Sequence, residues 1–497
     1  MLAMTRGIVL PAMTSCPALF AMTGTRNSAR NDEEYSIARD DSVPNSACDG
    51  TKLLMQKNLT QGSILKNIII FSLPYLLSYF LQTLYGMADL FLAGQFNGAA
   101  VISAVSIGSQ VMHMLTVIIV GLAMGGTVLI GQAVGACDIK RTSKVTGNTI
   151  TLFLIFSVLA TIILLATCRG IVSLVSTPPE SVDQTVSYLK ICFFGIPFIV
   201  AYNVIASIYR GMGDSKSPMI FVIIACSLNI ILDYIFMGVF GMQAEGAAIA
   251  TVIAQAVSVI ISLIAIVKTR SLKLTKKDFK IDHAVMSAIL KIGVPVACQD
   301  GFIQISFIVI TIIANRRGVN VAAAVGIVEK IICFLFLIPS SMLSSISAIA
   351  AQNIGAGYHD RARHTLYAGT AIAVGIGSIF AVAFQFISNP VIRLFTRDEI
   401  VITFGTQYLR SYVTDCVLAA IHFCFSGYFT AMGKSIISFI HNSISIILIR
   451  IPGAYLASRL WPETLFPMGC AAPLGSLLSA LICLGAYLWL RKKSVQY

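Results

Sequence analysis

The chain has 497 residues, of which 57% are hydrophobic and only 11% are charged. Soluble globular proteins carry about 25% charged residues, so this composition excludes a water-soluble enzyme. The formal net charge is +13, from 35 Lys and Arg against 22 Asp and Glu. In so apolar a chain, this surplus is typical of basic loops that set the orientation of a membrane protein, and no nucleic-acid partner is expected.

Residues 1–62 differ in composition from the rest of the chain. Their early apolar run is interrupted by Pro11 and Pro17, which argues against a signal peptide, and the following stretch is polar. We predict a disordered N-terminal extension. Alternatively, translation starts near Met55 and residues 1–54 are not part of the native protein.

Twelve apolar runs follow, each long enough for a membrane-spanning helix, which needs about 20 residues. The alternating ten-residue pattern of membrane-spanning strands does not occur in the sequence. The chain is therefore predicted to be an all-α polytopic membrane protein with twelve transmembrane helices. They are expected over 64–92, 101–134, 143–168, 184–209, 217–240, 246–268, 284–314, 320–348, 363–388, 402–430, 436–458 and 466–490.

Basic residues gather in one alternate set of the predicted loops. Examples are the cluster between Lys268 and Lys280 and the tail at 491–497, which holds Arg491, Lys492 and Lys493. Because positive loops face the cytoplasm, we predict a multi-pass protein of the cell membrane with both termini in the cytoplasm.

The two halves of the chain share short motifs about 220 residues apart. Matching pairs are Gly131-Gln132-Ala133 with Ala351-Gln352-Asn353, Leu73-Pro74 with Val294-Pro295, and Gly211-Met212-Gly213 with Ala431-Met432-Gly433. Six helices per copy give both copies the same orientation. We therefore expect two parallel-repeat six-helix lobes around a central cavity: an N-lobe at 63–267, a cytoplasmic linker at 268–282 and a C-lobe at 283–490.

Polar residues within the spans of the first half converge at one depth. Asn229 and Asp233 lie one helical turn apart and share a face, and Asp89 and Thr251 fall at a similar depth. Such an oxygen-rich pocket could bind Na⁺, or a proton shared by two carboxylates that repel each other. The alternative is that each acid only hydrogen-bonds to a neighbouring helix.

The second half places further charges within its spans. Asp300 and Asp415 fall near the bilayer midplane, and Glu329 is followed directly by Lys330. Adjacent helical residues point apart, so Lys330 could simply neutralise a neighbour. For Arg450 we expect a structural carboxylate or carbonyl partner. An interior with five acids and two bases favours organic cations.

No catalytic triad, HExxH or Walker motif occurs in the sequence, so the protein is predicted not to be an enzyme. The cysteines form no CxxC pair, and a zinc or disulfide framework is not expected. Close-packing or hinge positions are expected at small-residue spacings on the second span, at Gly121, Gly125, Gly126, Gly131 and Gly135.

Several of these segments together resemble the multidrug and toxic compound extrusion (MATE) family. The resemblance covers about residues 55–490. It rests on residues 58–74, Gln82-Thr83-Leu84-Tyr85, Ala88-Asp89, Gly131–Ala136, Arg210–Asp214, Asn229–Asp233 and Glu245–Thr251.

The resemblance implies a two-lobed exporter that exchanges Na⁺ or H⁺ for drug-like, often cationic compounds. Asp89, Asn229, Asp233 and Thr251 resemble the N-lobe ion site, and Gln82, Tyr85 and Asn203 resemble cavity residues around it. Asp415 resembles the C-lobe carboxylate, and Asp300 and Glu329 are further cavity candidates. Because both lobes contain carboxylates, the resemblance does not decide which lobe binds the coupling ion.

This resemblance implies no cofactor beyond the coupling ion. Small-molecule substrates and membrane lipids are the expected partners, and the protein is expected to be a monomer. Two alternatives remain open. One is a flippase for a lipid-linked saccharide from the same superfamily, which would have additional helices and a more basic cavity. The other is a membrane sensor or binding protein that does not transport.

Overall fold

The computed structural model describes residues 58–175, 177–269 and 274–495, which form helices and connecting turns without a strand. Of the N-terminal extension predicted over 1–62, residues 1–57 lie outside the described residues. Residues 270–273 of the predicted linker and the last two residues of the tail also lie outside them.

The first lobe runs from α3 to α9. Two of its spans are interrupted: α6 and α7 meet at an angle of 48°, and a π-helix, η2, continues α8. The first break comes just before Pro197, whose missing N–H cannot continue a helical ladder. The elements are α3 (Ile64–Phe96), α4 (Ala99–Gly135), α5 (Ile139–Leu174), η1 (Pro179–Ser181), α6 (Val182–Phe194), α7 (Ile196–Gly211), α8 (Lys216–Asp233), η2 (Tyr234–Val239) and α9 (Ala244–Thr269).

The second lobe repeats this order from α10 to α18. It has a bent pair of helices, α14 and α15, that meet at 40°, and a π-helix, η3, that follows α16. The elements are α10 (His283–Asn315), α11 (Val319–Leu335), α12 (Leu337–Gly355), α13 (His359–Arg393), α14 (Glu399–Tyr412), α15 (Asp415–Ala431), α16 (Ser435–Ser445), η3 (Ile446–Arg450), α17 (Ile451–Leu460) and α18 (Phe466–Val495).

The predicted all-helical fold is confirmed. The described residues contain ten helices long and apolar enough to cross a membrane, or up to twelve if each bent pair is one span. Large apolar side chains cover the outer faces of α5 and α13, where Leu154, Ile162 and Phe386 are each at least 60% exposed. Such a surface is stable against lipid rather than water, as expected for a multi-pass membrane protein.

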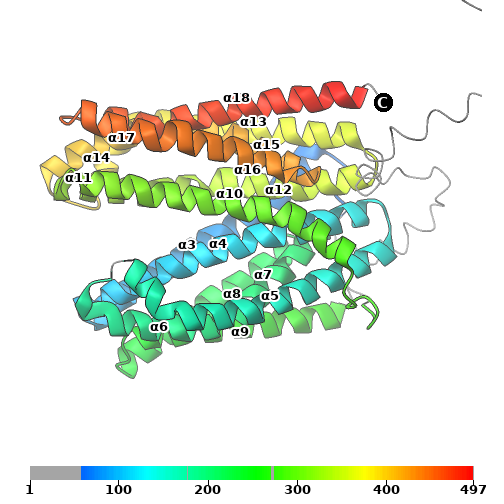
Figure 1. Cartoon of the computed structure of the whole chain (residues 1–497), viewed down its shortest axis with the longest axis horizontal. Helices are drawn as coiled ribbons and strands as arrows, with labels where there is room; N and C mark the ends of the chain where they lie inside the picture. The colour runs from blue at the N-terminus through cyan, green and yellow to red at the C-terminus, as the bar shows by residue number, and fades with distance from the viewer. Residues whose placement is uncertain (1–57, 176, 270–273, 496–497) are drawn as a thin grey trace, which may run out of the picture.

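The two lobes lie side by side, the second above the first in Figure 1, and α4 packs across the boundary against α10 and α12. Glycines allow the backbones to touch there. A Cβ built on Gly135 would lie 1.9 Å from the carbonyl oxygen of Gln352, and one on Gly355 would lie 2.0 Å from that of Gln132. A similar reciprocal contact recurs two to three turns earlier on α4, where a Cβ on Gly125 would lie 2.1 Å from the Ile289 carbonyl oxygen of α10. A Cβ on Gly293 of α10 would in turn lie 2.3 Å from the Leu122 carbonyl oxygen. The small-residue spacing on this span therefore serves close helix packing.

Two buried glutamines join the lobes in the same region. Gln132 on α4 donates its side-chain amide to the Ala431 carbonyl on α15, and Gln352 on α12 donates to the Gly211 carbonyl on α7. Both hydrogen bonds are 2.9 Å long. The two donors, Gln132 and Gln352, are 220 residues apart, and so are the two acceptors, Gly211 and Ala431. Each lobe thus donates one bond and accepts the other, and we call this pair of bonds the latch.

The latch lies at the end of the bundle where α3 begins, which we call the terminal end. The backbone N–H of Leu59, just before α3, donates to the Gln352 side chain at 3.3 Å. The last turns of α18 reach the same end, because Tyr487 packs against Tyr428 near the end of α15. The structure is thus closed at the end where the described chain begins and ends.

Residues 274–282, the part of the linker described after the gap, dock on the start of α5. Lys144 lies 2.5 Å from the Asp282 carboxylate, and Asp282 also caps α10 by accepting from the N–H groups of Ala284 and Val285. The hydrogen bond from Lys144 and these N–H groups hold the pKa of Asp282 below its usual value. The link between the lobes is therefore anchored at the terminal end.

Replacing Gly355 with Val tests whether glycine packing closes the terminal end. The new side chain would collide with the Gln132 carbonyl, which is backbone and cannot rotate away. We expect the melting temperature of the purified protein to fall by several degrees. Gly375→Val on α13 is the matched control, because nothing lies within 4 Å of its Cβ position. Equal melting temperatures for the two variants would contradict the packing role.

Candidate functional site

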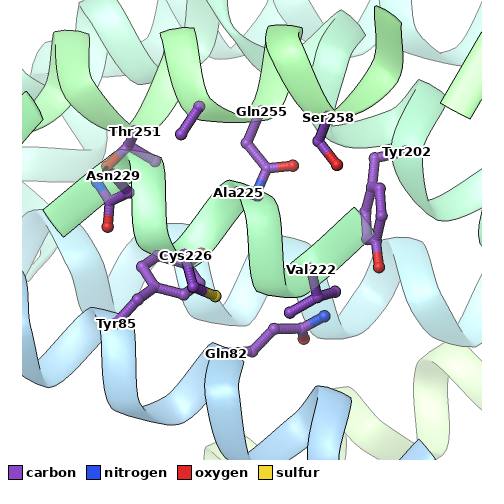
Figure 2. Close-up of a pocket in the computed structure, with 11 residues that line it drawn as sticks. Gln82, Tyr85, Tyr202, Val222, Ala225, Cys226, Asn229, Thr251, Gln255 and Ser258 are labelled. Carbon is purple, nitrogen blue, oxygen red and sulfur yellow. Dashed lines mark hydrogen bonds between the residues drawn. The ribbon is translucent and has the colours of Figure 1, made fainter. Parts of the chain in front are cut away.

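The first lobe contains a pocket of about 320 Å³, part of it open to the surroundings, between α3, α7, α8 and α9. In Figure 2, Gln82 and Tyr85 on α3 face a row of polar side chains on α9 across the pocket. Residues from all four helices line it: Gln82, Tyr85, Tyr202, Val222, Ala225, Cys226, Asn229, Thr251, Ala254, Gln255 and Ser258. The pocket lies within one lobe, not between the lobes.

Helical spacing explains how the polar lining arises. Thr251, Gln255 and Ser258 occur at intervals of four and three residues, which place them on one face of α9. The sequence prediction found Thr251 but missed Gln255 and Ser258, although this spacing could have revealed them. Tyr202 and Cys226 were also missed, because aromatic and thiol side chains within apolar runs give no distinctive signal.

Two carboxylates lie directly beyond this pocket. Asp89 is one helical turn past Tyr85 on α3, and Asp233 is one turn past Asn229 on α8. Asp89 is 2% exposed and Asp233 is fully buried, and Asp89 is close enough to interact with both Asn229 and Asp233. The Asn229 amide approaches the Thr251 hydroxyl at 3.5 Å. The structure thus brings together the four residues predicted as an ion site.

Most of the carboxylate and amide oxygens of this cluster lack a hydrogen-bond donor. Within the described chain, one oxygen of Asp89, both oxygens of Asp233 and the amide oxygen of Asn229 are buried without a hydrogen-bond partner. The salt bridges of the described residues lie elsewhere. Burying an unpaired carboxylate costs several kcal/mol, so a bound proton or cation would stabilise the site.

The donor set suits a small hard cation. Carboxylate, amide and hydroxyl oxygens are the ligands that such ions prefer. No group of three or more His, Cys, Asp or Glu side chains that could hold a metal ion occurs among the residues described. The oxygen ligands make the two-acid cluster a candidate for Na⁺ or for a shared proton. A π-helix begins directly after Asp233, a feature frequent at functional sites.

The other predicted cavity residues lie outside this pocket. Asn203 on α7 is buried and donates to the Ile199 carbonyl of its own helix at 2.8 Å. Asp300 on α10 is half-buried. Glu329 on α11 accepts from the Thr311 hydroxyl at 3.1 and 3.2 Å, and Asp415 is fully buried at the start of α15.

A second pocket, also about 320 Å³ and also partly open to the surroundings, lies in the second lobe. Its lining residues are Ile303, Phe336, His422, Phe423, Asn442, Ser445, Ile446, Arg450 and Ser476. Arg450 donates to the Tyr412 hydroxyl and lies 4.9 Å from the centre of the Phe307 ring. No carboxylate of the described chain lies within salt-bridge distance of Arg450. Its hydrogen-bond partner is thus a tyrosine hydroxyl, and not the carboxylate or carbonyl that we expected.

Comparison with known proteins agrees with this architecture. The family model MatE matches the chain twice, over residues 74–235 and 295–456. The two matches have the same length and their starts lie 221 residues apart, so each lobe is one copy of the family unit.

Curated relatives are similar over most of the chain. The "Probable multidrug resistance protein YoeA" of Bacillus subtilis (strain 168) is 25% identical over 448 residues, which cover 88% of this chain and 97% of the relative. The "Multidrug export protein MepA" of Staphylococcus haemolyticus (strain JCSC1435) is 26% identical over 380 residues, which cover 75% of this chain and 83% of the relative.

Solved structures share the fold. A structure described as "Crystal structure of MATE in the straight conformation" has a TM-score of 0.81 at 23% identity, covering 89% of this chain and 98% of its own. Another, "Outward-facing conformation of a multidrug resistance MATE family transporter of the MOP superfamily", has a TM-score of 0.81 at 22% identity, covering 89% and 97%. Because the MatE model matches well over half of the chain, this protein belongs to the MATE family.

Proposed function

We propose that the protein is a secondary active antiporter that exports drug-like, cationic organic compounds in exchange for Na⁺ or H⁺. One observation carries the proposal: two buried carboxylates, Asp89 and Asp233, lack a counter-charge and lie directly beyond a polar pocket. The relatives named for multidrug resistance and export support the class of substrate. The duplicated two-lobed fold is suited to alternating access.

Both termini lie in the cytoplasm in this proposal, as the basic loops and tail indicate. The terminal end is then the cytoplasmic side, and the Gln132 and Gln352 latch closes the protein toward the cytoplasm.

Coupling between cation binding and substrate binding follows from the position of Asn229, between the two carboxylates and the pocket. Its side chain lines the pocket and is close enough to Asp89 to interact with it, so a cation between the carboxylates and a compound in the pocket would share this residue. A ligand shifts a conformational equilibrium only by its differential affinity for the two states. Cation binding from outside would therefore favour release of the exported compound and return of the empty pocket.

The charge of the pocket favours this function over a lipid-linked saccharide flippase. The first-lobe cluster has two acids and no Lys or Arg within salt-bridge distance in the part of the chain described, whereas a flippase cavity is expected to be basic. A neighbour of the same fold from Pyrococcus furiosus is described as having a "reverse polarity of binding pocket" that "suggests different function". The acidic charge of the site in the present chain therefore favours a cationic compound as the exported substrate.

Asp89→Asn removes one of the two charges without changing side-chain size. We expect this variant to lose cation-driven dye export in everted membrane vesicles, because the neutral amide removes a charge that binds the coupling ion. Asp360→Asn is the control, since the Asp360 side chain is 84% exposed and pairs with Arg363 on the surface. Dye export at the wild-type rate by Asp89→Asn would exclude the first-lobe site.

Binding of the coupling ion should stabilise the protein. A ligand that binds only the folded state adds about 2.7 kcal/mol at a concentration of 100 Kd. We expect the melting temperature of the wild type to rise with either added Na⁺ or added acid, according to the coupling ion. Asp233→Asn should abolish most of this rise. An equal rise in the variant would place the ion site elsewhere.

A further inference from the structure

A row of aromatic and polar side chains runs along one side of α3, from the terminal end toward the two carboxylates. Tyr75, Tyr79, Gln82, Tyr85 and Asp89 follow one another at intervals of three and four residues, which place them on one side of the helix. Gln82 and Tyr85 line the first-lobe pocket, and Tyr79 lies one turn before Gln82. This row, which we call the α3 stripe, therefore connects the terminal end to the pocket.

The two tyrosines at the start of the α3 stripe bind an arginine, Arg210, from the last turn of α7. The ring centres of Tyr75 and Tyr79 lie 5.0 Å apart, and the two rings are tilted by 58°. The guanidinium carbon of Arg210 lies 4.5 Å from the centre of the Tyr75 ring, and the guanidinium also donates to the Tyr75 hydroxyl. Tyr79 is close enough to interact with the same group. Aromatic faces around a positive charge are the arrangement by which proteins recognise organic cations.

Arg210 lies near the end of the pocket that is remote from the carboxylates. In Figure 2, Tyr202 lies at the opposite end of the pocket from Asn229 and Thr251. Tyr202 is on the same helix as Arg210 and is close enough to interact with it. The arginine and its two rings thus lie between the terminal end and the pocket.

Arg210 has no acidic partner within salt-bridge distance among the residues described. Asp214 lies four residues further along the chain, but its carboxylate accepts from the N–H groups of Lys216 and Ser217 and from the Ser217 hydroxyl. The guanidinium is therefore held by aromatic faces and a hydroxyl rather than by a fixed counter-charge. Another organic cation would compete with it for the same rings.

The second lobe does not repeat this arrangement at the equivalent positions. The repeat offset is 221 residues at the start of α3 and 220 at the end of α7, as the matching motifs show. The equivalents of the two tyrosines and of Arg210 are then Val296, Asp300 and Thr430. None of these has a ring or a positive charge. The arginine and its rings thus belong to the lobe that contains the acidic pair.

We propose that Tyr75 and Tyr79 form an entry site for the cationic group of the exported compound, and that Arg210 occupies this site while the terminal end is closed. This inference rests on the proposed export function. A compound that enters from the cytoplasm binds the two rings when the terminal end opens, and then moves along the α3 stripe into the pocket.

The latch links the position of Arg210 to this closure. The next residue, Gly211, accepts the hydrogen bond from Gln352 of the other lobe. Breaking the latch frees the end of α7, and Arg210 leaves the rings with it. When the latch forms again, Arg210 returns to the rings, and the compound cannot leave by the route through which it entered.

The test measures how tightly purified protein binds radiolabelled tetraphenylphosphonium, an organic cation, by equilibrium dialysis. Arg210→Gln removes the competing charge, and we expect this variant to bind the probe about fivefold more tightly than the wild type. Arg363→Gln is the matched control, since it removes one positive charge from the surface of the same end. The control should bind the probe with wild-type affinity.

Variants of the tyrosines separate the rings from the charge. Tyr75→Phe keeps the ring but removes the hydroxyl to which Arg210 donates, and it should raise the affinity about twofold. Tyr75→Leu together with Tyr79→Leu removes both rings. Adding Arg210→Gln to this pair should then give no gain in affinity. The melting temperature shows whether each variant is folded, and Tyr75→Phe decides the matter if Arg210→Gln is not.

Three results would overturn the proposal. The first is that no folded variant among Arg210→Gln and Tyr75→Phe binds the probe more tightly than the wild type. The second is an equal gain in Arg363→Gln. The third is a gain from Arg210→Gln that persists without the two rings.

Failure of this proposal is distinct from failure of the proposed function, because the dialysis uses no ion gradient. If Asp89→Asn leaves cation-driven dye export intact, the antiport account of the first lobe is wrong. If that export is lost but the dialysis shows no gain, only the entry site is wrong.

Discussion

The cost of burying unpaired negative charge is the constraint on which the rest of the structure depends. Asp89 and Asp233 lie almost fully buried in an apolar bundle. Both oxygens of Asp233 and one oxygen of Asp89 have no hydrogen-bond donor in the described chain. A proton or a cation bound there would offset this cost. In the proposed function, the occupancy of this site is therefore linked to the stability and conformation of the whole lobe, as an ion-coupled cycle requires.

One helix in each lobe connects the pocket to the contact between the lobes. On α7, Tyr202 lines the first pocket and Gly211 accepts the hydrogen bond from Gln352, nine residues further along. On α15, His422 lines the second pocket and Ala431 accepts from Gln132, again nine residues further along. A shift of either helix on ligand binding would act on the latch at the terminal end. In each lobe, one helix thus connects the pocket to the same latch.

Much of this could be predicted from the sequence, because apolar length and repeat spacing depend on local patterns. The spans and the convergence of Asp89, Asn229, Asp233 and Thr251 follow from helical periodicity and depth. The reciprocal bonds of Gln132 and Gln352 could not be predicted, although both residues stood out in the repeat, since their carbonyl partners lie on the opposite lobe. The partner of Arg450 was missed for a similar reason: a tyrosine in an apolar run gives no sign of its contacts.

The most direct measurement of the central claim is transport into proteoliposomes of purified protein under separately imposed Na⁺ and pH gradients. The account predicts that one of these gradients, acting alone, drives a cationic dye against its own concentration gradient, and that the dye in turn drives the cation the opposite way. Movement of the dye that is the same with and without either gradient would contradict ion-coupled antiport.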